Sequence, residues 1–194
     1  MNHYQRRDYL RELRPYLIAS IIFFAVGTVI GAAVASRFPG LADHFGDSIA
    51  GFLTTFRGLP KPQLAAAIFL NNSVKTLAAI LLGLAIGIVP AVFLVVNGAV
   101  LGVVFFLSFH SRGVWPSLVS ILPHGVIELA AVFLGTAIGL MLGDVVLKRL
   151  LRKSDTKIRA ELGRAIGFFS IVIVPMLLAA ALIEAFVTTV IIGA

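Results

Sequence analysis

"PAVFLVVNGAVLGVVFFLSF", residues 90–109, is a run of twenty residues without a single charged side chain. In helical conformation twenty residues cover about 30 Å, which is the thickness of the hydrocarbon core of a bilayer. The whole chain has the same character, with 59% hydrophobic and 13% charged residues, whereas soluble domains carry about 25% charged residues. The sequence therefore predicts an all-α integral membrane protein, and 194 residues allow one domain.

Four more segments on either side of this run are long and apolar enough to span a membrane, at residues 16–35, 63–89, 123–146 and 165–191. We expect a single transmembrane domain over residues 1–194, built as a bundle of about five helices. Little except Pro90 separates the second span from the third, which predicts a tight antiparallel hairpin. The first run has twenty residues, more than the about 7–15 of a signal peptide, so we expect an uncleaved first span.

Two further segments are predicted to contact the membrane without crossing it. Residues 38–58 place five apolar side chains at spacings of three and four, which favours an amphipathic helix in the membrane interface or a lid over the spans. These side chains are Leu41, Phe45, Ile49, Phe52 and Phe56. Residues 116–122, "PSLVSIL", lie between Pro116 and Pro123. We expect a re-entrant half-helix there, followed by a new helix whose first turn holds Pro123.

The distribution of positive charge predicts the orientation of the chain. Lys and Arg flank the apolar segments, which is typical of membrane loops rather than of a nucleic-acid-binding surface, so no nucleic-acid partner is expected. Eleven of them lie in the N-terminal segment and in residues 148–164, against four on the opposite side. We therefore expect a multi-pass protein of the plasma membrane with a cytoplasmic N-terminus and an external C-terminus. The chain has no cysteine, which excludes disulfides and thiolate chemistry.

Seven polar or ionisable side chains interrupt the spans, where such groups are costly and by default mark function. They are Asn71, Asn72, Lys75, Asn97, His124, Glu128 and Glu184. Spacings of three and four put Asn71, Asn72 and Lys75 on one helical face, and His124 and Glu128 one turn apart. We predict that these residues form a site for a small solute or ion, with His124 and Glu128 directed into the bundle. A purely structural role, in which polar side chains join helices, is the alternative.

The same residues are compatible with two other kinds of site. A transition metal, if one is bound, would be held by His124, Glu128 and Glu184, since an imidazole and two carboxylates are ligand types that zinc accepts. His124 and Glu128 also resemble an acid–base pair. The nearest nucleophile in sequence is Ser120, four residues before His124. We expect neither an enzyme nor a cofactor.

Glycines recur four residues apart in four of the spans, a spacing that permits close approach of helix backbones. The pairs and triplet are Gly27/Gly31, Gly83/Gly87, Gly98/Gly102 and Gly135/Gly139/Gly143. This pattern indicates a tightly packed bundle rather than a wide pore.

The stretch "LPHGVIELAA", residues 122–131, resembles the stage II sporulation protein M family of integral membrane proteins. The resemblance extends from about residue 60 to 190. It rests on four elements in order: "NN" at 71–72, "NG" at 97–98, PHG-xx-EL from Pro123, and "AALIEAFVT" at 180–188. Lys75 is not part of that pattern. The resemblance implies, for the namesake in spore-forming bacteria, a scaffold that holds cell-wall hydrolases, and no agreed activity for members elsewhere.

Two functions follow as expectations. The first is movement or binding of a small solute or cation, in which Glu128 and Glu184 attract the cation, His124 gates it by protonation and the asparagines supply carbonyl oxygens. The alternative is a scaffold that recruits partners such as cell-envelope remodelling enzymes, through the helix at 38–58 or the basic segment 148–164. The expected partners are the lipid bilayer, a small cation or solute, and a second copy of the chain.

Overall fold

The structure is a computed structural model, and it describes the backbone of residues 3–54, 58–112 and 114–188. Within these ranges the side chains of 3–6, 49–50, 52–54, 110–124 and 187–188 lie outside the description. The elements are α1 (His3–Arg37), α2 (Pro39–Thr54), α3 (Lys61–Leu82), α4 (Ile88–Arg112), α5 (Val114–Leu150), α6 (Ile158–Phe168), η1 (Phe169–Ile173), α7 (Val174–Ile183) and η2 (Glu184–Thr188). All of them are helices, η1 and η2 being π-helical turns.

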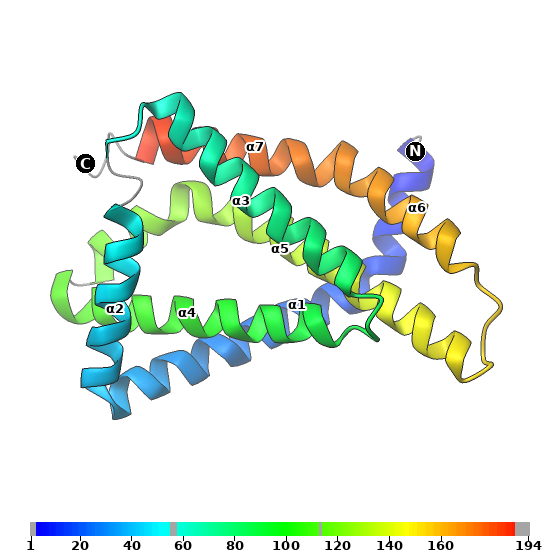
Figure 1. Cartoon of the computed structure of the whole chain (residues 1–194), viewed down its shortest axis with the longest axis horizontal. Coiled ribbons are helices and arrows are strands. Elements are labelled where there is room, and N and C mark those ends of the chain that lie inside the picture. The colour runs from blue at the N-terminus through cyan, green and yellow to red at the C-terminus, as the bar shows by residue number, and fades with distance from the viewer. Residues whose placement is uncertain (1–2, 55–57, 113, 189–194) are drawn as a thin grey trace.

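Five helical stretches are long and apolar enough to cross a membrane, which confirms the predicted fold class. They are Arg7–Arg37, Lys61–Leu82, Ile88–Phe109, Gly125–Leu150 and Ile158–Phe186. The N-terminus, the turn between α3 and α4, and the connection from α5 to α6 lie at one end of the bundle (Figure 1). The start of α3 and the end of η2 lie at the other end, beside α2 (Figure 1). The direction of the chain therefore alternates from span to span.

Helix α5 is the central element of the bundle. It contacts α1 and α4 on one side and α3 and α7 on the other, so it passes between two helix pairs (Figure 1). Half of its most apolar window is buried inside the chain, compared with 17–33% for the other spans. The outer helices therefore leave most of their apolar surface for contact with lipid or with another protein.

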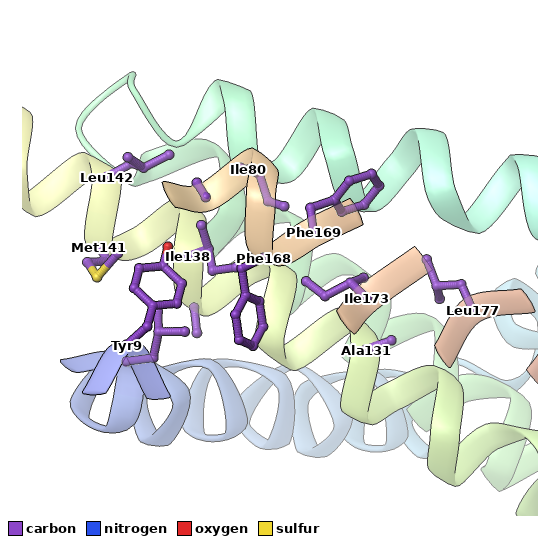
Figure 2. Close-up of a cluster of buried hydrophobic side chains, with 13 residues drawn as sticks. Tyr9, Ile80, Ala131, Ile138, Met141, Leu142, Phe168, Phe169, Ile173 and Leu177 are labelled. Atoms are coloured by element: carbon purple, nitrogen blue, oxygen red, sulfur yellow. The ribbon is translucent and has the colours of Figure 1, made fainter. Parts of the chain in front are cut away.

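An apolar core lies towards the end of the bundle that holds the N-terminus. Tyr9 of α1 projects into it beside Phe168 and Met141 (Figure 2). The rings of Tyr9 and Phe168 are 5.2 Å apart between centroids, and both side chains are buried. Ile80 from α3 and Ile138 from α5 extend the same cluster towards the middle of the bundle. The core thus joins α1, α3, α5 and α6 through apolar contact.

Close glycine contacts fix the helix pairs, as the sequence spacing predicts. α1 and α4 run side by side, and a Cβ at Gly27 or at Gly98 would overlap the backbone of the facing helix, at Val95 and Phe24 respectively. On the other side of the bundle a Cβ at Gly139 would come within 2.5 Å of the Ala79 carbonyl oxygen in α3. Helices without side chains at these positions can approach until their backbones touch.

A short turn joins the second and third spans, as predicted, but the two helices do not pack as a tight hairpin, because α5 passes between them and α4 packs against α1. The predicted boundary of the second span is also wrong. α3 ends at Leu82 rather than near residue 89, and a five-residue turn of Gly83–Gly87 precedes α4. Gly87 has φ +74° and Ile86 has φ +58°, left-handed values that redirect the chain immediately before α4 begins. Pro90 lies inside the first turn of α4, where its missing N–H breaks no hydrogen bond.

The predicted break before Pro123 is wrong. The backbone of α5 is helical without interruption from Val114 to Leu150, so residues 116–122 are part of this helix and not a separate half-helix. The prediction assumed that proline cannot continue a helix. Membrane helices tolerate proline because neighbouring helices and local adjustments satisfy the freed carbonyl groups. Figure 1 shows that α5 is bent near its start, which is the usual response of a helix to proline.

The predicted amphipathic segment at 38–58 contains a helix, α2, at Pro39–Thr54. It lies across the ends of α1 and α4 (Figure 1). Ala42 is buried, while Leu41 and Phe45 remain exposed. Phe52 and Phe56 of the predicted face lie outside the described side chains. Its interfacial position in a bilayer stays a prediction.

Candidate functional site

Helix α3 presents polar side chains on its outer surface. Asn71 and Lys75 are exposed. Leu70 and Val74, which directly precede them in the chain, are also exposed, at 58% and 63%. Asn71 lies at the middle of the helix, about 15 Å from its first residue at 1.5 Å per residue. The Asn71 side-chain amide donates a hydrogen bond of 3.2 Å to the Asn72 carbonyl oxygen. The three residues therefore share one side of the helix, as predicted, but that side does not face the centre of the bundle.

No ion pair involves Lys75 in the described part of the chain. Asn97 of α4 is half-buried and donates a 2.7 Å hydrogen bond to the carbonyl oxygen of Phe93 in its own helix. That bond occupies one donor of the amide and leaves its carbonyl oxygen available.

The two predicted carboxylates belong to elements that pack together. Glu128 lies in α5 and Glu184 begins η2, and η2 contacts both α5 and α3. Both side chains are half-buried and both have interaction partners. Their neighbour in sequence, His124, has a helical backbone, but its side chain lies outside the description. The metal prediction depends on that imidazole, and no cluster of three metal-ligating side chains occurs among the residues described.

The last span contains two π-helical turns, one of which begins at Glu184. η1, Phe169–Ile173, ends immediately before Val174 and Pro175. Its widened turn relieves the clash of the proline ring with the preceding turn of the helix. η2, Glu184–Thr188, has no proline after it in the chain. Single π-helical turns are frequent at functional sites, so η2 sets Glu184 apart from the rest of this span.

Sequence reasoning missed a polar pocket at the opposite end of the bundle, beside the N-terminal part of α1. It has a volume of about 470 Å³ and is open to the exterior. Its charged lining comes from α1, α5 and α6 and consists of Glu12, Asp144, Lys148, Glu161 and Arg164. Tyr16, Ser154 and Thr156 add hydroxyl groups, and Pro15, Met141 and Val145 add apolar surface.

Two hydrogen-bonded networks organise this pocket. In the first, the Tyr16 hydroxyl donates to Asp144 Oδ2 at 2.5 Å, and Lys148 Nζ lies 2.6 Å from the same oxygen. In the second, Arg164 donates to Glu12 Oε2 at 2.7 Å and to both carboxylate oxygens of Glu161 at 3.0 and 3.1 Å. The networks connect α1 to α5 and α1 to α6, respectively.

Arg164 also covers the aromatic face of Tyr9, with 4.7 Å between its guanidinium carbon and the ring centroid. A guanidinium at this distance makes a cation–π contact. The Tyr9 hydroxyl, by contrast, is buried without a hydrogen-bond partner in the described structure. Arg164 therefore contacts both the polar pocket, which it lines, and the apolar core, through the ring of Tyr9.

The sequence contained no local signal for this pocket. Tyr16 and Asp144 lie at the ends of predicted spans, where polar side chains are ordinary and mark no function. They are 128 positions apart in sequence, and no local pattern predicts that two such residues meet. The intramembrane polar residues could be identified because the free-energy cost of a polar side chain in a span can be judged from that span alone. The pocket, by contrast, depends on the tertiary arrangement of several helices.

The fold defines the class of protein: a polytopic, all-helical membrane protein with polar residues inside its spans. Comparison with known families agrees with this class. The chain belongs to the stage II sporulation protein M family, whose profile matches residues 20–189. This match confirms the resemblance drawn from the sequence and extends it to the first span. No curated protein and no solved structure matches the chain.

Proposed function

We propose that this protein is a non-catalytic membrane scaffold that recruits a partner transmembrane helix to the polar face of α3. The observation that carries the proposal is the outward exposure of Asn71 and Lys75 in the middle and second half of a 22-residue span. A lysine facing lipid near the centre of a bilayer costs about 2.5–3.5 kcal/mol. A partner helix that covers this face removes the penalty.

The chemistry of the face indicates the kind of partner. Asn71 keeps a carbonyl oxygen and one amide N–H beyond its bond to Asn72. Lys75 supplies a positive charge that no carboxylate of the described chain neutralises. A partner helix with a carboxylate and an amide or hydroxyl at matching depth satisfies both, and such polar contacts hold membrane helices together. The exposed Leu70 and Val74 supply apolar contact on either side.

Photocrosslinking in living cells tests this proposal. A photoreactive residue at Val74 is expected to form a discrete protein adduct, and Val96 of α4 provides a matched control because it is also an exposed valine in a span, at 53%. Asn71→Leu and Lys75→Leu should each abolish the adduct without lowering the amount of protein in the membrane. An adduct that persists in both variants, or one equally strong from Val96, would contradict the proposal. Two differently tagged copies of the chain show whether the adduct is a homo-oligomer.

Movement of a small cation or solute is the second candidate, and one observation favours it. Glu184 begins a π-helical turn that packs against α3 and α5, and α5 carries the half-buried Glu128. Flux through the purified protein in liposomes tests this function. Glu128→Gln and Glu184→Gln should each reduce the flux of the transported species. If no cation or small solute moves through the wild-type protein, this candidate is wrong and the scaffold stands alone.

The orientation belongs to the same proposal. The basic segments at the N-terminus and at 148–164 support a cytoplasmic location of the end that holds the polar pocket. The chain has no cysteine, so single cysteines introduced at Ser154 and at Gly40 can be labelled separately in intact cells. Labelling at position 40 but not at 154 by a membrane-impermeant reagent is expected, and the reverse would invert the orientation.

A further inference from the structure

The pocket at the end of the bundle has features of a ligand site that the scaffold role does not use. Its volume of about 470 Å³ lies within the range of about 300–1,000 Å³ that small-molecule sites occupy. Charged groups line it together with Pro15, Met141 and Val145. A ligand that fits such a lining has a charged part and an adjoining apolar part.

The position of the pocket along the spans suggests where that ligand comes from. Tyr16 is the first residue of the twenty-residue apolar run of α1, so it lies near the level of the lipid headgroups. Tyrosine is enriched at this level because one end of its side chain is apolar and the other polar. Lys148 and Asp144 lie in the last turns of α5, at the corresponding depth.

The charge of the pocket determines which group it accepts. Three carboxylates face two cations, which gives a local excess of one negative charge in a chain whose net charge is +7. In the described structure the bonds of Glu12 and Asp144 use one oxygen of each carboxylate, Oε2 and Oδ2. Their second oxygens remain available to accept hydrogen bonds from a primary ammonium group.

The same pocket offers donors to an anion beside that ammonium group. Lys148 Nζ makes one bond, to Asp144, and its side chain is 53% exposed, so it keeps two N–H donors. The hydroxyl groups of Ser154 and Thr156, which are 2.7 Å apart, lie in the same lining. A phosphate accepts hydrogen bonds from both kinds of donor.

We propose that the pocket formed by Glu12, Tyr16, Asp144, Lys148 and Arg164 binds a phosphoethanolamine group, with its ammonium at Glu12 and Asp144 and its phosphate at Lys148. Phosphatidylethanolamine in the surrounding bilayer and free phosphoethanolamine both carry this group. The apolar residues Pro15, Met141 and Val145 would contact the glycerol and upper acyl carbons of the lipid.

Native mass spectrometry of the full chain in detergent tests the proposal by titration with lipids of identical acyl chains. Phosphatidylethanolamine should bind about tenfold more tightly than phosphatidylcholine, because a quaternary ammonium has no N–H to donate and one charge-assisted hydrogen bond corresponds to about that factor. The mono- and dimethylated lipids should fall in between. Equal binding of phosphatidylethanolamine and phosphatidylcholine would overturn the proposal.

Variants locate the site. Glu12→Gln and Asp144→Asn should each reduce phosphatidylethanolamine binding to the level of phosphatidylcholine. Asp8→Asn should leave it unchanged, since Asp8 lies on the same helix one turn before Glu12 but does not line the pocket. Selectivity that survives in both Glu12→Gln and Asp144→Asn would place the site elsewhere and overturn the assignment. Glu12 is half-exposed, so its variant is expected to fold even if Asp144→Asn does not.

Free phosphoethanolamine distinguishes the two sources of the group. It is added to protein saturated with phosphatidylethanolamine in the same experiment. Displacement of the lipid at millimolar concentration supports recognition of the headgroup alone, whereas retention of the lipid supports a site that also needs the acyl chains. The crosslinking at Val74 is independent of these outcomes, because Val74 lies on α3 outside the pocket.

Discussion

Gly31 of α1 lies directly against Ala99 of α4, so that a Cβ on Gly31 would overlap the Ala99 carbonyl oxygen. One turn earlier, Gly27 has the same relation to Val95. From the other helix, Gly102 lies against Thr28. The two helices therefore touch along their backbones over several turns, and their separation is set by the absence of side chains.

Gly31→Ala is expected to destabilise the bundle by about 1–3 kcal/mol, the range for added volume in a well-packed interior. Gly167→Ala is the matched control, because Gly167 is also helical but a Cβ there would meet nothing within 4 Å. The control should be neutral or stabilising by up to about 1 kcal/mol, since alanine favours helix over glycine. Unfolding of both variants in mixed micelles measures the difference. Equal stabilities would show that α1 and α4 are not in backbone contact.

Two tyrosines on one helix differ in what their hydroxyl groups contact, which gives a second test. The Tyr16 hydroxyl donates to Asp144, whereas the buried Tyr9 hydroxyl has no partner in the described structure. Tyr16→Phe should lower the free energy of unfolding by about 1–2 kcal/mol, because a hydrogen bond to a carboxylate is lost. Tyr9→Phe should be neutral or stabilising, because it removes a buried polar group that lacks a partner. Thermal unfolding in one detergent compares them, and the opposite ranking would refute the geometry.

Arg164 is expected to resist even conservative replacement. Its guanidinium contacts Glu12 and Glu161 at once and covers the ring of Tyr9. Lysine is a point charge without the planar fork, so Arg164→Lys cannot keep all three contacts. We expect a loss of about 1 kcal/mol, since the Arg164 side chain is 36% exposed and solvent screens part of the interaction. Arg159→Lys on the exposed side of α6 is the control and should have no measurable effect.

The number of spans could be predicted from the sequence because the hydrophobic length of a segment is a local property. The direction in which α3 presents Asn71 and Lys75 could not, since helical periodicity shows that residues share a face but not what that face meets. The error at Pro123 has a similar origin. The cost of proline was taken from isolated helices, while the surrounding bundle determines whether a membrane helix accepts it. The contact between Tyr16 and Asp144 depends on the packing of two distant helices.

The turn between α3 and α4 provides the last prediction. Ile86 has φ +58° and Gly87 has φ +74°, and a left-handed conformation costs a residue with a Cβ about 1–2 kcal/mol. Asparagine adopts this conformation more readily than a β-branched residue. Because Ile86 is exposed, Ile86→Asn should raise the free energy of unfolding by about 1 kcal/mol.

Gly87→Ala provides the converse measurement on the same turn. A Cβ at Gly87 would meet nothing closer than 3.6 Å, at the Leu140 side chain, so packing tolerates it and only the backbone conformation opposes it. We expect a loss of about 1 kcal/mol or more. Thermal unfolding of both variants and of the wild-type protein shows whether each substitution stabilises or destabilises the protein. If Ile86→Asn is no more stable than wild type while Gly87→Ala is no less stable, the turn does not hold these left-handed residues, and the boundary of α3 at Leu82 is wrong.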